Sequence, residues 1–464
     1  MSELPSGWAE CLLEDLLGPL DDGKVLQQGW SPQCDSVPAT EGEWGVLKTT
    51  AVQDGYFLEV ENKKLPLKLP PKPELEVKAG DLLMTCAGPR SRCGVICHVE
   101  ETREKLIFSG KIYRFRPNKQ YVAPKFLTHL LRTTELKEKI DNIKTGISES
   151  GMNMTRDRFF SLQVRLAPFD EQFRIAKKLD ELLAQVDTLK ARIDAIPDLL
   201  KRFRQSVLAA AASGRLTEDW RTVSDTDELL ISWQDTKLSE LCALVTSGSR
   251  GWADYYSESG AIFIRSQDIN TDDLDITDTA FVKLPESSEG KRTRVQAQDI
   301  LITITGANVG KVARVKQAVP EAYVSQHVAL VRLQNPEHAP FIEIFLKDIG
   351  SGRGELTELA YGGGKPGLNL SNIRDLAFAL PSRDEQFEIV RRVEQLFTFA
   401  DQLEAKVASA KTRIDLLAQS ILAKAFRGEL VPQDPNDEPA SVLLERIKAQ
   451  RVATSKDKRG RKNA

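Results

Sequence analysis

Asp170-Glu171-Gln172-Phe173 recurs as Asp384-Glu385-Gln386-Phe387, an offset of 214 residues within a chain of 464. The match then continues without a gap to Leu216 and Leu430, and about a third of the paired positions are identical. Chance similarity between two helical segments would not hold one register over this length. The sequence therefore predicts that one structural element occurs twice in the chain.

Each copy of the repeat is predicted to be a long helix with a narrow apolar seam, because its apolar residues alternate at spacings of three and four. The seam residues are Leu179, Leu182, Val186, Leu189, Ile193, Ile196, Leu200, Phe203 and Val207 in the first copy, and Val393, Leu396, Ala400, Leu403, Val407, Ala410, Ile414, Leu417 and Ile421 in the second. One partner helix buries so narrow a stripe best, so we expect the copies to form an antiparallel coiled coil about 60 Å long. Packing of each helix on its own globular domain is the alternative.

Glycine and proline mark the expected limits of the two helices. Pro197 has no backbone N–H and should kink the first helix or mark a local break, whereas Lys411 occupies the matching place in the second. Gly214 and Gly428 stand at matching positions near the two ends, where glycine commonly forms a C-terminal cap. Both copies therefore predict the same end, but only the first predicts an interruption.

The segments outside the repeat contain short β-like runs broken by Gly, Pro and Asn. Residues 295–315 have the pattern of a strand, a glycine turn and a second strand, and residues 81–99 are similar. Gly151-Met152-Asn153-Met154 also parallels Gly367-Leu368-Asn369-Leu370. We therefore predict an α+β fold with pseudo-two-fold symmetry. Its parts are a first domain (1–167), a first helix (168–216), a second domain (217–381), a second helix (382–430), and a short C-terminal helix with a basic tail (431–464).

Composition limits the possible functions only loosely. The chain has 64 Lys and Arg residues against 67 Asp and Glu residues, a net charge of -3, so any surface for nucleic acid must be local. Its six irregularly spaced cysteines do not suggest a disulfide framework. We find neither a secretory leader nor an apolar run of the roughly 20 residues that cross a membrane. The expectation is a soluble, cytoplasmic protein.

The second helix ends in Gln-Ser-Ile-Leu-Ala-Lys-Ala-Phe-Arg-Gly-Glu-Leu (419–430) and follows the second of two related domains. This arrangement resembles the specificity subunit of type I restriction-modification systems, over essentially the whole chain. The strongest likeness lies in residues 384–430, in residues 179–216 and in Tyr323-Val324-Ser325-Gln326-His327. The tail helix expected around residues 441–450 resembles the enteric, type IA-like branch of that family.

The resemblance implies a non-catalytic DNA-binding subunit. Each target-recognition domain would read one half of a split site in double-stranded DNA, and the helix pair would set the gap between the halves. Two adenine-methyltransferase subunits would dock on the helices, and restriction subunits with motor activity would join them. S-adenosylmethionine, ATP and Mg²⁺ would be bound by those partners, and this chain would hold no cofactor or metal.

Candidate DNA contacts are side chains that fit base edges or phosphates, especially Arg or Lys for guanine and Asn or Gln for adenine. One set follows β-like runs: Lys48, Thr49, Thr50 and Gln53 in the first domain, and Arg265, Ser266, Gln267 and Asn270 in the second. Another set stands in glycine-rich segments, where the backbone can approach a phosphate: Arg90, Arg92, Asn308, Lys311 and Lys365. Plain solvated loops and hairpins are the alternatives, and for Gln326 and His327 the alternative is a purely structural role.

Motifs of catalysis and of metal binding do not fit this sequence. Gly306 to Lys311 has three rather than four residues between its glycines, unlike a phosphate-binding P-loop. Cys93, Cys97 and His98 match none of the usual zinc spacings. An Asn- or Asp-Pro-Pro-aromatic segment of an adenine methyltransferase is also missing. A coiled-coil adaptor that binds only proteins, and a self-sufficient DNA-modifying enzyme, are the competing hypotheses.

Overall fold

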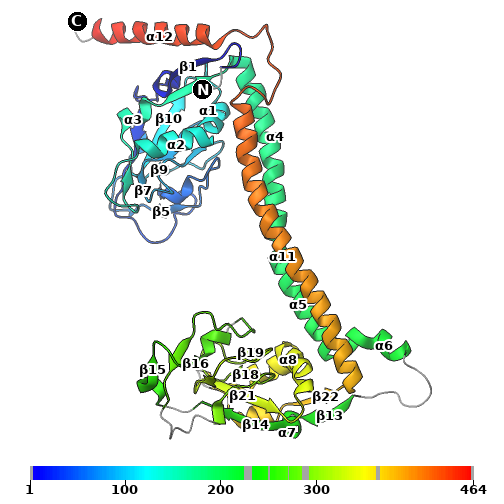
Figure 1. Ribbon diagram of the computed structural model, residues 1–464. Helices are drawn as coiled ribbons and strands as arrows, with labels where there is room; N and C mark the ends of the chain where they lie inside the picture. The colour runs from blue at the N-terminus through cyan, green and yellow to red at the C-terminus, as the bar shows by residue number, and fades with distance from the viewer. Residues whose placement is uncertain are drawn as a thin grey trace. The chain divides into compact units, whose positions relative to one another are not determined.

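The computed structural model describes residues 4–223, 233–248, 251–269, 271–284, 292–361 and 366–460. Contacts divide the chain into two compact units: residues 1–193 with 410–464, and residues 194–409. Each unit contains one β-rich domain and part of both repeat helices (Figure 1). Helices and several small sheets occur in both units, so the protein is of the α+β class.

The β-rich domain of the first unit joins strands from distant parts of its sequence. Its central sheet has the order β2 (Leu17–Gly18), β10 (Ile112–Pro117), β6 (Leu82–Thr85) and β8 (Ile96–His98), with β3 (Leu26–Gln28) also paired to β10. A second sheet has the order β5 (Asn62–Lys64), β4 (Gly45–Leu47) and β9 (Leu106–Phe108). The remaining pairs are β1 (Ala9–Leu12) with β12 (Gln163–Leu166), and β7 (Ala87–Gly88) with β11 (Met152–Asn153). Its short helices are α1 (Pro124–Leu131), α2 (Thr134–Ile143) and α3 (Arg156–Phe160).

The second unit has a related set of strands. One sheet has the order β14 (Cys242–Ser247), β21 (Val328–Leu333), β18 (Ile300–Thr303) and β19 (Val312–Arg314). Another has the order β15 (Tyr256–Ser257), β17 (Ala280–Val282), β16 (Ala261–Ile264) and β20 (Ala322–Val324). A third pairs β13 (Gln234–Lys237) with β22 (Ala377–Leu380). The helices are α6 (Glu218–Val223), α7 (Leu238–Leu241), α8 (Ala339–Lys347), α9 (Gly352–Glu358) and α10 (Leu370–Arg374).

The two domains share their register as well as their order of strands. The predicted strand-turn-strand units are confirmed, since β6 pairs with β8 and β18 pairs with β19, both antiparallel. The parallel between residues 151–154 and 367–370 is also confirmed, because both segments bridge to the residues that follow the first strand of the hairpin. In each sheet a buried aspartate before that strand pairs with an arginine of the long neighbouring strand. These pairs are Asp81 with Arg116 and Asp299 with Arg332.

The first repeat helix is broken where proline was expected to disturb it. The helix α4 (Phe169–Asp194) ends just before Ala195, and α5 (Ile196–Ala212) begins with Pro197 in its first turn. Proline is tolerated there because the first N–H groups of a helix have no intrahelical partner. The second copy, α11 (Arg383–Ala425), is one helix of 43 residues. Gly214 and Gly428 both adopt left-handed backbone angles after their helices, which confirms the predicted C-terminal caps.

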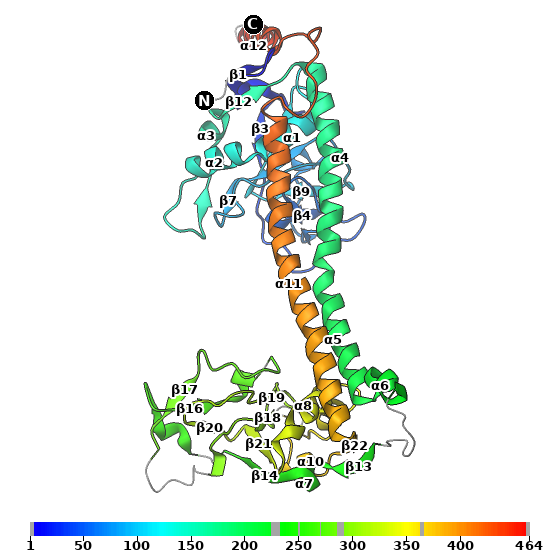
Figure 2. The same cartoon turned by 45° about the vertical axis from the view of Figure 1, so that its right-hand side comes forward.

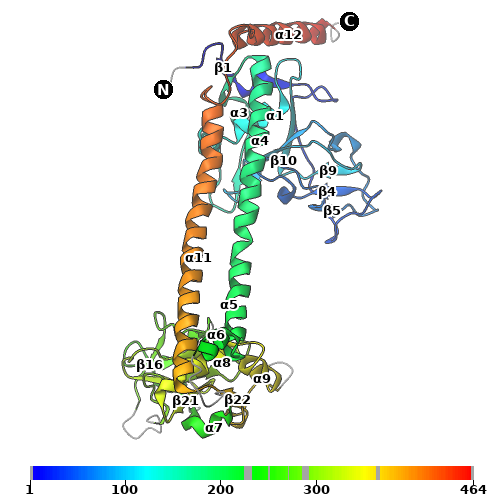
Figure 3. The same cartoon turned by 90° about the vertical axis from the view of Figure 1, so that its right-hand side faces the viewer.

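Within each unit, parts of the two repeat helices pack together. In the first unit, where α4 runs beside the end of α11 (Figure 3), Leu179 belongs to the same buried cluster as Leu422 of α11 and Phe426 just after that helix. In the second unit, Val207 and Ala211 of α5 share a cluster with Ile389 and Val393 from the start of α11 (Figure 2). Most predicted seam positions are buried or half-buried. Leu189 and Leu417 differ, at 45% and 46% exposed.

The repeated Asp-Glu-Gln-Phe motif begins both long helices and ties each to its own domain. The indole N–H of Trp8 donates to Glu171 at 3.1 Å, and that of Trp233 donates to Glu385 at the same distance. The next residue is a buried glutamine in both copies. Its amide donates to the backbone carbonyl five residues earlier, at Ala167 for Gln172 and at Pro381 for Gln386. The motif is thus explained by the joint between a helix and the domain before it.

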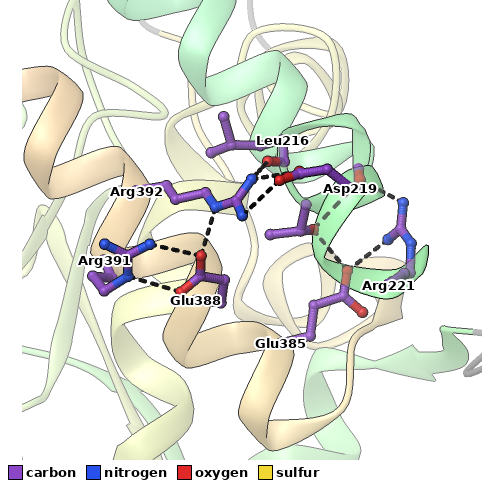
Figure 4. A network of polar contacts seen from close by, with 9 residues as sticks. Leu216, Asp219, Arg221, Glu385, Glu388, Arg391 and Arg392 are labelled. Atoms are coloured by element: carbon purple, nitrogen blue, oxygen red, sulfur yellow. Dashed lines mark hydrogen bonds and ion pairs between the residues drawn. The ribbon is translucent and has the colours of Figure 1, made fainter. Parts of the chain in front are cut away.

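The start of α11 is also held by the segment that follows α5 (Figure 4). Arg392 donates to the carbonyl of Leu216 at 2.8 Å and pairs with Asp219 at 2.6 Å. Glu385 accepts hydrogen bonds from Arg221 and from the hydroxyl of Thr217. Residues just beyond the first repeat helix therefore neutralise charges at the start of the second.

The C-terminal helix α12 (Ala440–Gly460) packs on the N-terminal segment of the first unit. Leu443, Leu444 and Ile447 are buried, and the N–H of Ala440 donates to the carbonyl of Gly7 at 2.8 Å. Arg174 of α4 pairs with Asp437 just before this helix. The expected tail helix is present and longer than residues 441–450. None of the helices in the described ranges is long and apolar enough to cross a lipid bilayer.

Candidate nucleic-acid interface

The segment that follows β4, residues 48–55, is called the first reading loop after its predicted role, and it contains the short 3-10 helix Thr49–Ala51. Lys48 lies 2.7 Å from the carboxylate of Glu61, and the hydroxyl of Thr50 donates to the same carboxylate. The side-chain amide of Gln53 donates to the carbonyl of Thr50 at 2.6 Å. The polar groups predicted to meet DNA therefore have partners within the protein, and a contact with DNA would share or replace these bonds.

The first glycine turn, residues 88–94, carries two arginines with different partners. Arg92 donates through Nη2 to the carbonyls of Thr49 and Val52, each at 2.6 Å, and its Nη1 lies 3.4 Å from Gln53 Oε1. Arg90 instead pairs with Glu149 at 2.8 Å and with Asp141 at 2.7 Å. Arg92 therefore bonds the turn to the reading loop, whereas Arg90 bonds the turn to α2 and to the segment that follows it.

These pairs shift the titration of the groups involved. The hydrogen bonds that Arg90 donates to Glu149 and Asp141 raise its pKa. A hydrogen bond from Lys144, followed by one from Arg90, lowers the pKa of Asp141 despite some desolvation. The charges around the first glycine turn thus largely neutralise one another.

Three first-domain candidates share one groove. This groove has a volume of about 630 Å³, and its lining includes Gln53, Arg90 and Arg92 together with Lys137 and Lys144. The sequence placed these candidates almost 40 residues apart in two separate sets. The structure brings the reading loop and the glycine turn to a common surface.

The second reading loop, residues 265–272, follows β16 and contains the 3-10 helix Ser266–Ile269. Arg265 is held by Asp268: its Nη2 lies 3.1 Å from one carboxylate oxygen, and its backbone N–H donates to the other at 2.7 Å. Ser266 is half-buried and Gln267 is exposed. Asn270 lies outside the described residues. The loop matches the first in position and in its short helix, but its cation pairs with an aspartate of the loop itself.

The second glycine turn, residues 306–311, is bonded to the second reading loop. Asp272 accepts from the ammonium of Lys311 at 3.2 Å, from the N–H of Val312 at 3.0 Å, and from Arg353 of α9. Although burial opposes ionisation, the hydrogen bonds from Arg353 and Val312 hold the pKa of Asp272 below its usual value. The carbonyl of Asn308 accepts from the N–H of Lys311 at 3.0 Å. Lys365 lies outside the described residues.

The residues Gln326 and His327 lie in the exposed connection between β20 and β21. Their side chains are 3.2 Å apart, and His327 Nδ1 lies 3.0 Å from the hydroxyl of Thr305. Because Thr305 directly precedes the second glycine turn, these two side chains stand beside the second candidate surface.

Sequence reasoning missed the acidic and basic residues that hold the candidates. In the first domain Asp54 pairs with Arg132 and Lys137 at 3.1 and 2.9 Å. In the second, Asp272 and Arg353 play this part. A non-glycine residue with positive φ would have marked Asp272, whose φ is 64°, but backbone angles cannot be read from an isolated loop sequence.

Comparison with known proteins identifies relatives over most of the chain. The family described as type I restriction modification DNA specificity domain matches residues 63–198 and 231–410. The StySPI type I restriction enzyme specificity subunit of Salmonella potsdam is 32% identical over 90% of this chain and 91% of the relative. The EcoKI specificity subunit of Escherichia coli K12 is 33% identical over 80% of this chain and 77% of its own length.

Solved structures show the same fold at low sequence identity. The HsdS subunit from Thermoanaerobacter tengcongensis aligns with a TM-score of 0.56 and 19% identity, over 92% of this chain and 98% of that one. A chain from a study of assembly and conformational transition of the type I R-M system aligns with a TM-score of 0.63 and 18% identity, over 92% and 100%. The duplicated domains, the repeated helix joints and these matches together show that the chain belongs to the type I restriction-modification DNA specificity family.

Proposed function

We propose that the chain is the DNA specificity subunit of a type I restriction-modification complex, and that each β-rich domain reads one half of a split DNA site. The observation that carries this proposal is that the two β-rich domains share a fold but carry different side chains on their reading loops and glycine turns. Both domains present a reading loop and a glycine turn at equivalent places, but the side chains and their partners differ. Two domains of one fold with different polar side chains at equivalent positions are suited to read two different half-sites.

The chain acts in this proposal without chemistry of its own. Two adenine-methyltransferase subunits dock on the repeat helices, and restriction subunits with motor activity join the complex in the cytoplasm. S-adenosylmethionine, ATP and Mg²⁺ belong to those partners. The duplication supports the pair of methyltransferase sites, because the joints at Glu171 and Glu385 present the starts of α4 and α11 in a similar way.

The repeat helices are proposed to form one antiparallel coiled coil whose length sets the gap between the half-sites. Supporting contacts occur in each unit taken by itself. Lys190 pairs with Asp415 at 2.8 Å in the first unit, and Arg204 pairs with Asp401 at 2.5 Å in the second. Inserting or deleting one heptad in both helices should change the tolerated gap and leave both half-sites unchanged. An unchanged gap would refute the spacer role.

Mapping methylated adenines in a genome that carries this subunit and its partners would test the main proposal. We expect a single bipartite motif with a fixed gap. A wrong base pair in either half should weaken binding by about 1–3 kcal/mol, with a strong dependence on salt. Equal binding of all duplexes by the assembled complex would refute the proposal. Complete failure to retain DNA would favour a protein adaptor instead.

A further inference from the structure

In both domains the reading loop is joined to the neighbouring glycine turn or to the strand after it. The seventh residue after the cation of each loop, Gly55 after Lys48 and Asp272 after Arg265, has a left-handed backbone with φ of 96° and 64°. Each of these residues bonds to the first residue of the strand after the turn. The N–H of Gly55 donates to the carbonyl of Ile96 at 2.9 Å, and Asp272 accepts from the N–H of Val312.

In both domains the turn or the strand after it donates and the loop accepts, but the side chain that makes the principal bond comes from the turn in the first domain and from the loop in the second. In the first domain the turn supplies the donor, because Arg92 reaches the carbonyls of Thr49 and Val52. In the second domain the loop supplies the acceptor, because Asp272 takes bonds from Lys311 and Val312 of the turn and its following strand. The two residues occupy different positions in the sequence but make the same connection.

In the first domain, an aspartate at the position of Asp272 would displace the guanidinium of Arg132. A Cβ atom added to Gly55 would lie 2.3 Å from the guanidinium carbon of Arg132, which pairs with Asp54 next to it. In this domain the arginine of the turn makes the connection instead. Arg92 is half-buried, and its Nε is buried without a hydrogen-bond partner, so its position is set by the loop carbonyls that Nη2 binds.

We propose that Arg92 and Asp272 are positioning residues, each of which fixes a reading loop to its glycine turn so that the two meet DNA as one preformed surface. This inference rests on the proposed function and assigns to these two residues the specificity of separate half-sites. Ordering a free loop on binding costs conformational entropy, which a loop already bonded to the turn avoids. A loosened loop also adapts to a wrong base pair. Loosening it should therefore reduce discrimination between correct and wrong base pairs, while the affinity for DNA of any sequence, which depends on the phosphates, should change little.

The test uses the complete complex with its methyltransferase partner, at one fixed salt concentration. The DNA probes are a duplex with both half-sites, two duplexes with a single wrong base pair in one or the other half, and an unrelated duplex. Arg92→Met removes the donors but keeps most of the apolar stem. Asp272→Gly removes the acceptor but permits the left-handed backbone. Each variant should lower discrimination about tenfold or more at one half-site, and the two variants should affect different half-sites.

Matched controls separate positioning from general damage. Arg103→Met removes similar bonds to the carbonyls of Glu43 and Ala39 elsewhere in the first domain. Asp273→Asn removes an exposed pair with Lys316, one residue beyond Asp272. Both controls should keep discrimination within about twofold of wild type. Arg92→Lys, which retains a donor, should restore part of the discrimination that Arg92→Met loses.

The affinity for the unrelated duplex and its salt dependence identify the role. Positioning leaves both within about twofold of wild type, whereas direct phosphate binding by Arg92 would lower the affinity for every duplex and the salt slope by about one. The inference is refuted by that uniform loss, by equal loss at both half-sites, or by unchanged discrimination in both variants. If the wild-type complex does not discriminate between duplexes, the proposed function itself is refuted.

Discussion

The two copies of the repeat begin with the same buried glutamate but balance its charge differently. Glu171 accepts from the indole of Trp8, and burial raises the pKa of its carboxyl. Glu385 accepts from Trp233, Thr217 and Arg221. The repeated motif therefore determines the joint, whereas residues outside the motif determine its electrostatics. A similar contrast separates α4 and α5, broken at Ala195, from the continuous α11.

Introducing the proline break into the second repeat helix should lower the free energy of unfolding more than any other change considered below. Lys411→Pro places proline inside α11, where it removes a backbone donor and clashes with the preceding turn, at a cost of about 3 kcal/mol or more. Pro197→Ala should change stability by less than about 1 kcal/mol, because Pro197 already occupies a first helical turn. Amide hydrogen exchange across residues 400–420 and 190–205 measures both. Comparable losses would contradict the assignment of the break to the first copy alone.

Neutralising either buried glutamate should change the free energy of unfolding less, and the loss should be larger for Glu385 than for Glu171. Glu385→Gln leaves Arg221 without its carboxylate partner, and because Arg221 is partly exposed we expect a loss of about 1–2 kcal/mol. Glu171→Gln retains an oxygen for Trp8 and removes a buried charge, so it should be neutral or slightly stabilising. Denaturant unfolding with amide exchange at residues 5–12 and 215–221 compares them. Equal losses in the two variants would show that Arg221 adds nothing to the joint.

The smallest predicted effect is a dependence on pH at the first joint. Because the folded pKa of Glu171 is raised, the folded chain binds a proton more readily than the unfolded chain at mildly acidic pH. The penalty for the buried charge is present above the folded pKa and disappears as the pH falls towards the ordinary value. Amide protection of residues 5–12 should therefore rise on mild acidification relative to Glu171→Gln. Parallel pH profiles for the two proteins would contradict the shift.

The helical parts were the most predictable because their signals are local. Apolar residues at three- and four-residue spacing identify a helix without knowledge of its partner, and Gly214, Gly428 and Pro197 act through their own backbone preferences. The seam was less certain in detail. Leu189 and Leu417 fit its spacing but are exposed, since spacing identifies a helix face and cannot say how much of that face a neighbour covers.

The candidate interface was predictable only as a set of segments. Arg92 and Lys311 are predicted contacts because of their charge beside glycine, but the structure bonds them to the reading loops of their own domains. No sequence signal identifies Asp272, because nothing in its local sequence shows that Val312 and Arg353 converge on it. Whether these side chains contact DNA remains a prediction, and their present partners are the protein's own backbone and counter-charges.

The duplication, the helix ends and the break at Pro197 can be read from the amino-acid sequence, because each depends on periodicity or on the backbone preference of a single residue. Which charges are paired, such as Glu385 with Arg221 and Asp272 with Lys311, depends on the folded arrangement. Those pairs join residues up to 164 positions apart. Coulomb and hydrogen-bond energies depend on distance in space, and distance along the chain does not specify it.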